Sequence, residues 1–455
     1  MRLVNALRLT GPGPAQRYPP PCTALTGAGG KSTALFRLGR ELARERGVLL
    51  TASTHLAVEQ LQQADRHMVI HSPADLKHVQ PPRSGEVLLL TGPPGADERT
   101  SGLAPAALDV VNELTREHQL PLLLEADGSR RLPLKAPGEH EPAVPAWVNQ
   151  VVVVAGLTGL GRPLDAAWVH RPERFAALSG IDLQAAITVG ALSSVLASPE
   201  GGLKGIPDAA RRILLLNQAD THELQAAGAN LARRLVPPYS AAVVSRLQGT
   251  APDEEALAVY EPAAGIILAA GGASRLGKPK QLLEWKGEPF VRAVARTALE
   301  AGLAPVIVVT GAAADEVQQA LSDLPVQFVH NPDWESGQGS SVATGARSLP
   351  PECGAAVYLL SDQPQIPAAL VRSLVELHSR TLAPLTAPLA DGRRANPVLF
   401  DRVTFGELQQ LSGETGGRSL FARYRPEWLP WHDASILLDV DTEQDYQRLL
   451  ESDAA

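Results

Sequence analysis

The 455-residue sequence has little cysteine, no basic tract and no long hydrophobic run, and each absence excludes a class of protein. Cys22 and Cys353 are too few for a disulfide framework and form no zinc-binding pattern, which fits a reducing cytoplasm. A net charge of −8 argues against broad binding to nucleic acid or to an anionic membrane. The longest apolar runs, such as 151–156 and 265–270, are far shorter than the about 20 residues of a membrane helix. No apolar segment of a signal peptide follows the first ten residues, so we expect a cytoplasmic protein without a nucleic-acid or membrane partner.

The length and the order of the apolar runs predict two α/β domains. A chain of 455 residues is longer than a domain with a single hydrophobic core usually is. Short buried runs alternate with helical stretches in both halves, as in mainly parallel sheets covered by helices. The alternation lapses at 249–263, where glycine, proline and acidic residues gather. We therefore expect an N-terminal domain at 20–248, a linker at 249–263 and a C-terminal domain at 264–455.

A glycine-rich turn follows the first predicted strand of the C-terminal half. The run 266–270 leads into Gly271 and Gly272, and Arg275 and Lys280 come shortly afterwards. Backbone N–H groups of such a turn can bind phosphate, and the two cations can neutralise a triphosphate. The alternative is an ordinary tight turn beside solvated basic residues.

Two carboxylates are candidate ligands of Mg²⁺. Asp362 follows the predicted strand 357–360, at the edge where open α/β sheets bind ligands. Asp441 lies near the end of the chain, on the same strand face as Asp439. Mg²⁺ usually takes one or two carboxylates together with substrate phosphates. Either aspartate could instead cap the helix that follows it.

Taken in order, these segments resemble the MobA-like and MocA-like nucleotidyltransferases. LAAGGASRLGKPKQLL at 268–283 is similar to their glycine-rich signature, and NPDWESGQGSS at 331–341 is similar to the segment that borders the nucleotide. Residues 393–398 resemble the segment that faces the pterin, although Ala395 replaces a common glycine. Residues 414–418 resemble a GDxGAR segment, with departures at two positions. The resemblance covers 266–450.

This resemblance implies a Rossmann-like α/β/α domain that transfers CMP from CTP to molybdopterin, giving molybdopterin cytosine dinucleotide and pyrophosphate. Ala270 favours CTP, because LAAG accompanies cytidylyl transfer more often than guanylyl transfer in such enzymes. The acceptor phosphate is already an anion, so catalysis needs positioning and charge neutralisation rather than a general base. The implied site residues are Arg275, Lys280 and Asp362 for catalysis; Leu268, Ala269, Ala270, Gly271, Gly272, Lys280, Asn331, Gly337, Ser340 and Ser341 for the nucleotide; Asn396 and Pro397 for the acceptor; and Asp362 and Asp441 for Mg²⁺.

A second phosphate-loop pattern lies near the N-terminus. Leu25 stands where a full Walker A motif has glycine, so the loop is a shortened GxxGKS, similar to that of Mur ligases. Glu125 and Asp127 follow the apolar run 120–124, like a Walker B segment. We expect a P-loop-like domain that binds ATP or GTP, with phosphates held by the loop and by the following helix N-terminus. The candidate residues are Gly27, Gly29, Gly30, Lys31, Ser32 and Thr33, with Lys31 on the outer phosphate and Ser32 on Mg²⁺.

Two further groups of polar residues in this half allow more than one interpretation. Asn217 to Asp220 are loosely similar to the base-reading NKxD loop, with glutamine in place of lysine, and an ordinary loop explains them as well. A second group is either a solvated polar face or a substrate surface, because nearness in sequence does not establish nearness in space. It comprises Arg130, Arg131, Lys135, His140 and His170.

The N-terminal half resembles the YqeC-like family, accessory proteins associated with selenium-dependent molybdenum hydroxylases. The matching segments are GAGGKST at 27–33, EADGSRRLPLKAPGEHEP at 125–142, HRPERFAALSG at 170–180 and GGLKGIP at 201–207, within 24–244. The resemblance implies nucleotide binding without naming a substrate.

Together the two resemblances imply a fused enzyme of molybdenum-cofactor maturation whose partner is a molybdenum hydroxylase or its chaperone. The alternatives are guanylyl transfer to molybdopterin and a non-catalytic carrier of the molybdenum cofactor. A sugar nucleotidyltransferase is disfavoured by the 331–341 segment.

Overall fold

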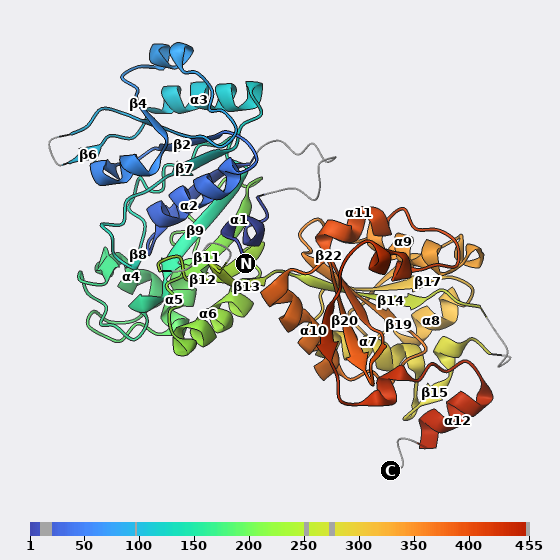
Figure 1. The fold of residues 1–455 in the computed structure, drawn as a ribbon. Coiled ribbons are helices and arrows are strands. Elements are labelled where there is room, and N and C mark those ends of the chain that lie inside the picture. The colour runs from blue at the N-terminus through green and yellow to red at the C-terminus, as the bar shows by residue number, and fades with distance from the viewer. Residues whose placement is uncertain (10–20, 96–97, 250–253, 273–277, 452–455) are drawn as a thin grey trace. The chain divides into compact units, whose positions relative to one another are not determined.

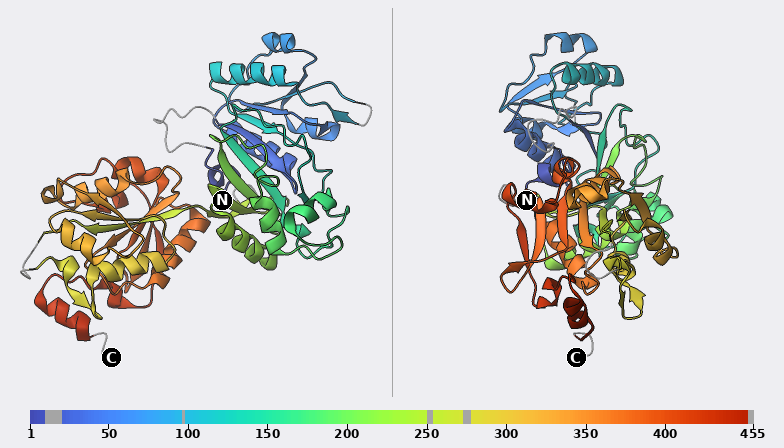
Figure 2. Two further views of the ribbon diagram at one scale, coloured as in Figure 1. Left: turned by 180° about the vertical axis from the view of Figure 1, so that it is seen from behind. Right: turned by 90° about the vertical axis from the view of Figure 1, so that its right-hand side faces the viewer.

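The computed structural model describes residues 1–9, 21–95, 98–249, 254–272 and 278–451. They form two compact units, Met1–Tyr260 and Glu261–Ala455, each built around a sheet of its own (Figures 1 and 2). This confirms the predicted class of two α/β domains. Among the described residues, no helix is long and apolar enough to cross a membrane.

The N-terminal unit contains a nine-stranded sheet that is parallel except at one edge. Across the sheet the strands are β13 (Ala256–Tyr260), β12 (Ala241–Ser245), β11 (Arg211–Asn217), β9 (Gln150–Gly156), β1 (Cys22–Gly27), β7 (Leu122–Glu125), β2 (Val48–Ala52), β5 (Val87–Thr91) and β4 (Arg66–Val69). The helices are α1 (Leu3–Ala6), α2 (Lys31–Ala43), α3 (Pro105–Glu117), α4 (Pro172–Ser179), α5 (Val189–Ala197) and α6 (His222–Leu235). Two short two-stranded ribbons complete the unit. One pairs β3 (Leu56–Ala57) with β6 (Arg99–Thr100), and the other pairs β8 (Leu134–Lys135) with β10 (Val169–His170).

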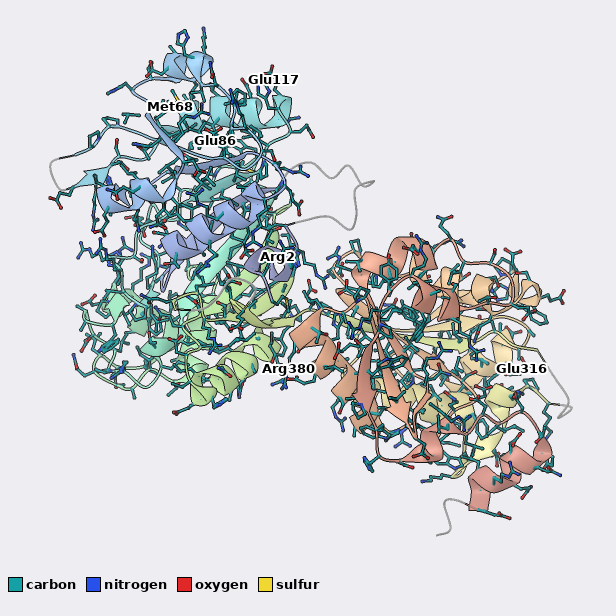
Figure 3. The ribbon with its side chains drawn as sticks, viewed as in Figure 1. Arg2, Met68, Glu86, Glu117, Glu316 and Arg380 are labelled. Carbon is teal, nitrogen blue, oxygen red and sulfur yellow. The ribbon has the colours of Figure 1, made fainter. Side chains whose placement is uncertain are left out.

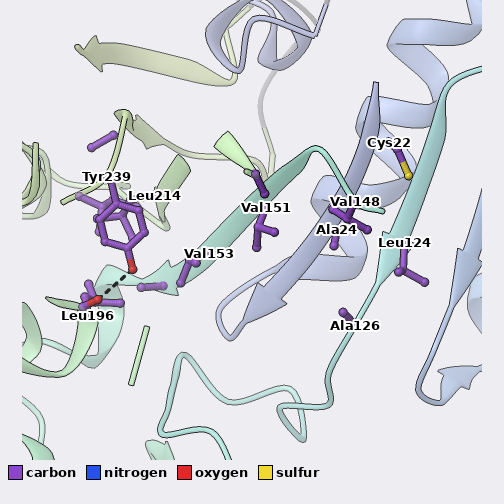
Figure 4. Close-up of a cluster of buried hydrophobic side chains, with 14 of the residues drawn as sticks. Cys22, Ala24, Leu124, Ala126, Val148, Val151, Val153, Leu196, Leu214 and Tyr239 are labelled. Carbon is purple, nitrogen blue, oxygen red and sulfur yellow. Dashed lines mark hydrogen bonds between the residues drawn. The ribbon is translucent and has the colours of Figure 1, made fainter. Parts of the chain in front are cut away.

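Most inner strands of this sheet are buried along their whole length. Every residue of β2, β5, β7, β9 and β12 is buried, as expected of a parallel sheet covered on both faces. Figure 4 shows part of the core, where the hydroxyl of Tyr239 donates a hydrogen bond to Leu196 O at 2.9 Å. This bond satisfies the one polar atom of a fully buried ring.

The stretch 249–263, predicted to be a linker, instead contains strand β13. This strand pairs antiparallel with β12, and the amino group of Met1 donates to Ala256 O at 3.2 Å. The acidic residues and prolines that suggested a linker only flank a short apolar run, and an antiparallel edge strand needs no more than that. Helix α1 also lies outside the predicted 20–248. Only Glu261 and Pro262 separate β13 from β14 (Ala263–Ala269), the first strand of the second unit.

The C-terminal unit is a mixed sheet with β14 near its centre. The order is β18 (Gln327–His330), β17 (Val306–Thr310), β14, β19 (Ala355–Leu360), β22 (Val398–Asp401), β20 (Leu385–Ala390) and β21 (Arg393–Arg394), and β23 (Glu427–Pro430) also pairs with β20. The first four strands are parallel, and β22 is antiparallel to both of its neighbours. The helices are α7 (Phe290–Glu300), α8 (Ala314–Ala320), α9 (Gln338–Arg347), α10 (Ala368–Thr381), α11 (Phe405–Leu408) and α12 (Glu443–Glu451), and a small ribbon pairs β15 (Glu284–Trp285) with β16 (Glu288–Pro289).

Alternating residues of β14 enter two separate cores, one on each face of the sheet. Ile267 packs with Val291 of α7 and Leu370 of α10, whereas Ile266 packs with Val342 of α9. This follows from the two-residue period of a strand and gives an α/β/α sandwich. The helices turn polar faces outward, and Figure 3 shows Glu117 of α3, Glu316 of α8 and Arg380 of α10 on outer helices, where all three are exposed.

Candidate functional sites

The C-terminal unit has a pocket of about 240 Å³ at the carboxyl ends of β14 and β19. Its lining combines cations, aromatic rings and polar side chains that come from segments far apart in sequence. Arg394 lies over the ring of Phe421, with the guanidinium carbon 4.4 Å from the ring centre. The lining includes Leu268 and Leu360 at the strand ends; Tyr358, Phe400 and Phe421; Arg393, Arg394 and Arg418; and Gln363, Asn396 and Asp439. Such a pocket suits a flat, anionic ligand.

A group of charged side chains lies next to this pocket. Burial raises the pKa of Asp362 to about 6; the charge of Lys280 opposes this rise, and the charges of Asp439 and Asp441 add to it. The Lys280 ammonium contacts Asp441 Oδ1 at 2.5 Å, and Gln363 Nε2 donates to Asp439 Oδ1 at 2.5 Å. The structure therefore brings Lys280, Asp362 and Asp441 together, as the sequence predicted, and adds Asp439 and Gln363.

These carboxylates do not form a preassembled metal cage. In the described part of the chain, no three His, Cys, Asp or Glu side chains converge as a group that could hold a metal ion. Mg²⁺ does not need such a cage, because it keeps waters and binds one or two carboxylates together with substrate phosphates. The position of the half-buried Asp362 beside two other carboxylates, with one lysine to offset their charge, fits a cation that arrives with a phosphate ligand.

One buried side chain, that of Gln281, fixes the backbone of the turn after β14. Gln281 Nε2 donates to Gly271 O at 2.9 Å and to Ala269 O at 3.4 Å. A Cβ on Gly272 would lie 3.1 Å from the ring of Trp334. Arg275, predicted to be catalytic, belongs to 273–277, outside the described residues.

The segment 331–341 is shaped by an asparagine that is itself buried. Asn331 is 1% exposed, and its Nδ2 donates to Ser340 Oγ at 2.8 Å and to Ser341 Oγ at 3.0 Å. A Cβ at Gly337, whose φ is +112°, would lie 2.5 Å from the backbone of Gly413. The Asn331 side chain fixes the shape of this loop, and its contact with a nucleotide stays a prediction. Pro397, predicted to contact the acceptor, is buried, and Asn396 is half-buried.

In the N-terminal unit, β1 ends at Gly27 and α2 begins at Lys31, with a tight loop between them. Three loop amides already have partners within the protein: Gly27 N donates to Asp127 Oδ2 at 3.0 Å, Ala28 N to Val154 O at 2.8 Å, and Gly29 N to Leu132 O at 3.0 Å. Gly27 and Gly29 thus shape the loop rather than donate to a phosphate, which corrects the predicted role of their amides. The N–H groups of the first turn of α2, which have no partner within the helix, remain available to an anion.

Lys31 is buried within this loop, its side chain 2% exposed. Its Nζ donates to Gly27 O at 2.7 Å and lies 3.3 Å from Asp127 Oδ1. Ser32 Oγ donates to Glu125 Oε2 at 2.8 Å, and burial raises the pKa of that glutamic acid. Lys31, Ser32, Glu125 and Asp127 therefore converge, as expected of a phosphate loop beside a strand-end acidic pair. Thr33 is exposed on the first turn of α2.

A chain of ion pairs continues from Asp127 to Lys135, one of the polar residues that the sequence assigns either to a solvated face or to a substrate surface. Lys135, 3% exposed at its side chain, donates to Asp127 Oδ2 at 2.7 Å and to Glu141 Oε2 at 2.8 Å, and Arg171 pairs with the same glutamate. Burial would raise the pKa of Glu141, but hydrogen bonds from Arg171 and Lys135 lower it to about 2. Lys135 is therefore no solvated residue. Burial and the charges of Arg171 and Lys135 lower the pKa of His170 to about 4, so it is neutral at pH 7.

Asn217, at the end of β11, ties three segments together. Its Nδ2 donates to Gly29 O of the loop at 2.7 Å, and its Oδ1 accepts from Ser245 Oγ at 3.3 Å and Leu247 N at 3.1 Å. The sequence left two interpretations open for residues 217–220, a base-reading loop and an ordinary loop, and these contacts make Asn217 a structural link to the phosphate loop in either case.

Comparisons with known proteins match each half separately. The family described as the YqeC protein matches residues 23–173, and the MobA-like NTP transferase domain matches residues 265–428. YqeC of Escherichia coli K12 is 32% identical over 211 residues, which cover 44% of this chain and 76% of that protein. Nicotine blue oxidoreductase of Paenarthrobacter nicotinovorans is 34% identical over 41% of this chain and 95% of its own length.

Two further relatives resemble the C-terminal half. The molybdenum cofactor cytidylyltransferase of E. coli K12 is 25% identical over 40% of this chain and 92% of its own length. Among solved structures, Rv0371c of Mycobacterium tuberculosis H37Rv is 31% identical, with a TM-score of 0.39, over 42% of this chain and 98% of that one.

Proposed function

Because the chain belongs to the YqeC family through its N-terminal half and to the MobA-like NTP transferases through its C-terminal half, we propose that it transfers CMP from CTP to molybdopterin. The C-terminal half is a nucleotidyltransferase domain of molybdenum-cofactor biosynthesis. The choice of CTP is supported by Ala270 and by the cytidylyltransferase among the relatives. The observation that carries the proposal is the half-buried Asp362 beside Lys280 and Asp441, next to Gln363 and Asp439, which line the arginine-lined pocket.

The pocket is assigned to the acceptor. The rings of Tyr358, Phe400 and Phe421 can pack against a flat pterin, and Arg393, Arg394 and Arg418 supply positive charge for an anionic group. Partial burial and the nearby Arg418 lower the pKa of Arg394, as expected where a like charge lies close to a guanidinium that has lost part of its hydration. An acceptor that carries a phosphate would relieve this repulsion. Asn396 gives a polar contact at the same wall.

The residues fit Mg²⁺ at the other end of the site. Asp362 and Asp441 supply carboxylate oxygens, and the ion would neutralise charge on the triphosphate. Lys280, which contacts Asp441 at 2.5 Å, would move its charge to a phosphate oxygen when the ion takes over the carboxylate. Asn331 and the amides of the 337–341 segment fix the loop against which the nucleotide rests.

The reaction needs orientation more than proton transfer. An oxygen of the acceptor phosphate forms a bond to the α-phosphorus of CTP, the bond from that phosphorus to the bridging oxygen breaks, and pyrophosphate leaves. The nucleophile is already an anion, so no general base is needed, and the residues act by holding the two phosphates in line.

The N-terminal domain is proposed to bind ATP or GTP for a coupled step that serves a molybdenum hydroxylase or its chaperone. Support comes from Lys31 and Ser32 beside Glu125 and Asp127, and from Thr33, which is exposed on the first turn of α2. Guanylyl transfer by the C-terminal domain and a non-catalytic carrier are the competing functions.

The decisive measurement is metal-dependent release of pyrophosphate from CTP or GTP in the presence of molybdopterin. Asp362→Ala should lower this turnover by about 100-fold or more, since it removes a charge-stabilising group from the transition state. The matched control is Asp315→Ala, which removes an exposed carboxylate on α8 and should leave the rate unchanged.

Each outcome separates the candidates. Turnover with GTP alone would replace cytidylyl transfer by guanylyl transfer. Absence of turnover with both nucleotides would favour the carrier, or a redox reaction of the kind named for the Paenarthrobacter relative. Near-normal turnover in Asp362→Ala would refute the metal assignment.

A further inference from the structure

We propose that the N-terminal domain binds a guanine nucleotide and that Asn217 and Asp220 recognise its base. This inference rests on the proposed binding of a nucleoside triphosphate by the same domain and names the base that it takes. It comes from three observations: the contacts of Asn217, the position of β11 in the sheet, and the free carboxylate of Asp220.

Asn217 is placed to couple a base to the phosphate loop. The side chain is 4% exposed, and its Oδ1 is saturated by Ser245 Oγ and Leu247 N. One N–H of Nδ2 is used on Gly29 O of the loop at 2.7 Å. An amide carries two N–H groups, and the hydrogen bonds of the described residues account for only one of them. The second can donate to a ring acceptor such as N7 of a purine.

The sheet order puts this asparagine at a suitable distance from the phosphates. β11 is separated from β1 by β9 alone, and all three strands are parallel. Their carboxyl ends therefore lie on one edge, where open α/β sheets bind ligands. Two strand spacings amount to about 10 Å, a span that a ribose and the near part of a purine can cover.

Asp220 is exposed at this edge and is not needed to cap the following helix. Helix α6 begins at His222, and its cap is Thr221, whose hydroxyl accepts from Leu224 N at 3.2 Å. No hydrogen bond or ion pair with another described residue engages the Asp220 carboxylate. The usual explanation for an aspartate before a helix therefore does not apply, and both oxygens are open to a ligand.

The chemistry of this carboxylate selects guanine over adenine. Guanine presents two adjacent donors, N1–H and the N2 amino group, which match the two oxygens of one carboxylate. Adenine presents a lone pair at N1, which a carboxylate repels. Gln218, between the two recognising residues, has a φ of +65°, and its Oε1 accepts from Thr158 Oγ1 at 2.5 Å. Its side chain occupies the space that a Cβ on Gly156 would need, and this fixes one wall of the proposed base site.

The test measures binding of fluorescent GTP and ATP analogues with Mg²⁺ to the full chain. The chain carries Lys280→Ala and Asp362→Ala, which weaken the transferase site. GTP should bind at least about 100-fold more tightly than ATP, because a polar base site strongly rejects the wrong hydrogen-bond pattern. Asp220→Asn should lower GTP affinity by a similar factor and raise the affinity for xanthosine triphosphate, whose O2 accepts from the new amide. Glu223→Gln, which removes a neighbouring exposed charge on α6, should change neither.

The outcomes distinguish this inference from the function on which it rests. Equal or tighter binding of ATP would overturn the base assignment and leave the phosphate-loop proposal in place. Binding of neither nucleotide would overturn both. A fall in GTP affinity in Asp220→Asn without a gain for the xanthine nucleotide, with an unchanged melting temperature, would also refute recognition of the base by Asp220.

Discussion

The two glycine-rich turns of this chain hold their lysines in opposite ways. Lys31 of the N-terminal loop is buried, donates to Gly27 O and lies 3.3 Å from Asp127. Lys280 of the C-terminal site pairs with Asp441, whose side chain is 66% exposed. The first loop is packed against the backbone of β9, whereas a Cβ on Gly271 in the second turn would meet no atom of the described residues within 4 Å.

This difference means that one of the two proposed phosphate sites is built into a core and the other is open. In the first, the charges and the loop shape are already fixed, so the loop resists change. In the second, few contacts hold the parts, and a substrate would complete the arrangement. A change at equivalent positions should therefore alter stability in the N-terminal domain and turnover in the C-terminal one.

The largest expected contrast is between two glycine substitutions. Gly29→Ala would place a methyl group 2.3 Å from the backbone of Gly156 at a φ of +81°, and backbone cannot move aside cheaply. We expect a loss of about 4 kcal/mol in the free energy of unfolding of the N-terminal unit, measured by urea titration. Gly271→Ala should change stability by less than about 0.5 kcal/mol. Equal losses in the two variants would show that both loops are packed alike.

The next contrast exchanges each lysine for methionine. Lys31→Met leaves the buried Asp127 with less compensation and should destabilise the N-terminal unit by about 3 kcal/mol. Lys280→Met removes a partly exposed pair and should cost less than about 1 kcal/mol, while pyrophosphate release falls by about 100-fold. Calorimetric melting and the turnover assay read these two effects separately. An unchanged free energy of unfolding in Lys31→Met would mean that Lys135 alone compensates the charge of the buried Asp127.

The smallest expected effect is a dependence on pH at Asp362. Burial raises the pKa of this group to about 6 in the folded chain, above the value of about 3.9 for an unfolded aspartate. The folded state therefore holds the proton more tightly, so this group lowers the stability of the fold as the pH rises from about 4 to about 6, and the loss is complete above that range. Asp362→Asn should raise the free energy of unfolding by about 2 kcal/mol at pH 8 and leave it unchanged near pH 3.5. A gain that is constant across this range would contradict the raised pKa.

Sequence patterns predicted best those features that depend on local order. Strand ends of a parallel sheet meet at one edge, so the approach of Asp362 to Lys280 was predictable, as was that of Lys31 to Asp127. Asp441 was predicted on a strand, but it lies instead in the loop before α12. The role of Asn331 was missed because a motif reports which residue is present and not which way its side chain turns.

Features that depend on distant pairing were not predictable in the same way. The burial of Lys135 requires the ribbon of β8 and β10, whose strands lie more than thirty residues apart in sequence. The arginine-lined pocket likewise joins β21 to residues near Phe421. The sequence predicts a linker where strand β13 lies, because the strand has only five residues and the residues around it are polar.

The two residues Glu261 and Pro262, which alone lie between β13 and β14, have a consequence for how such a gene could arise or be divided. A recombination point at residue 248 would strip β13 from one product and leave the edge of β12 bare, ready to pair with other chains. Only a seam at these two codons keeps both sheets whole, so viable splits and fusions of this gene should cluster there.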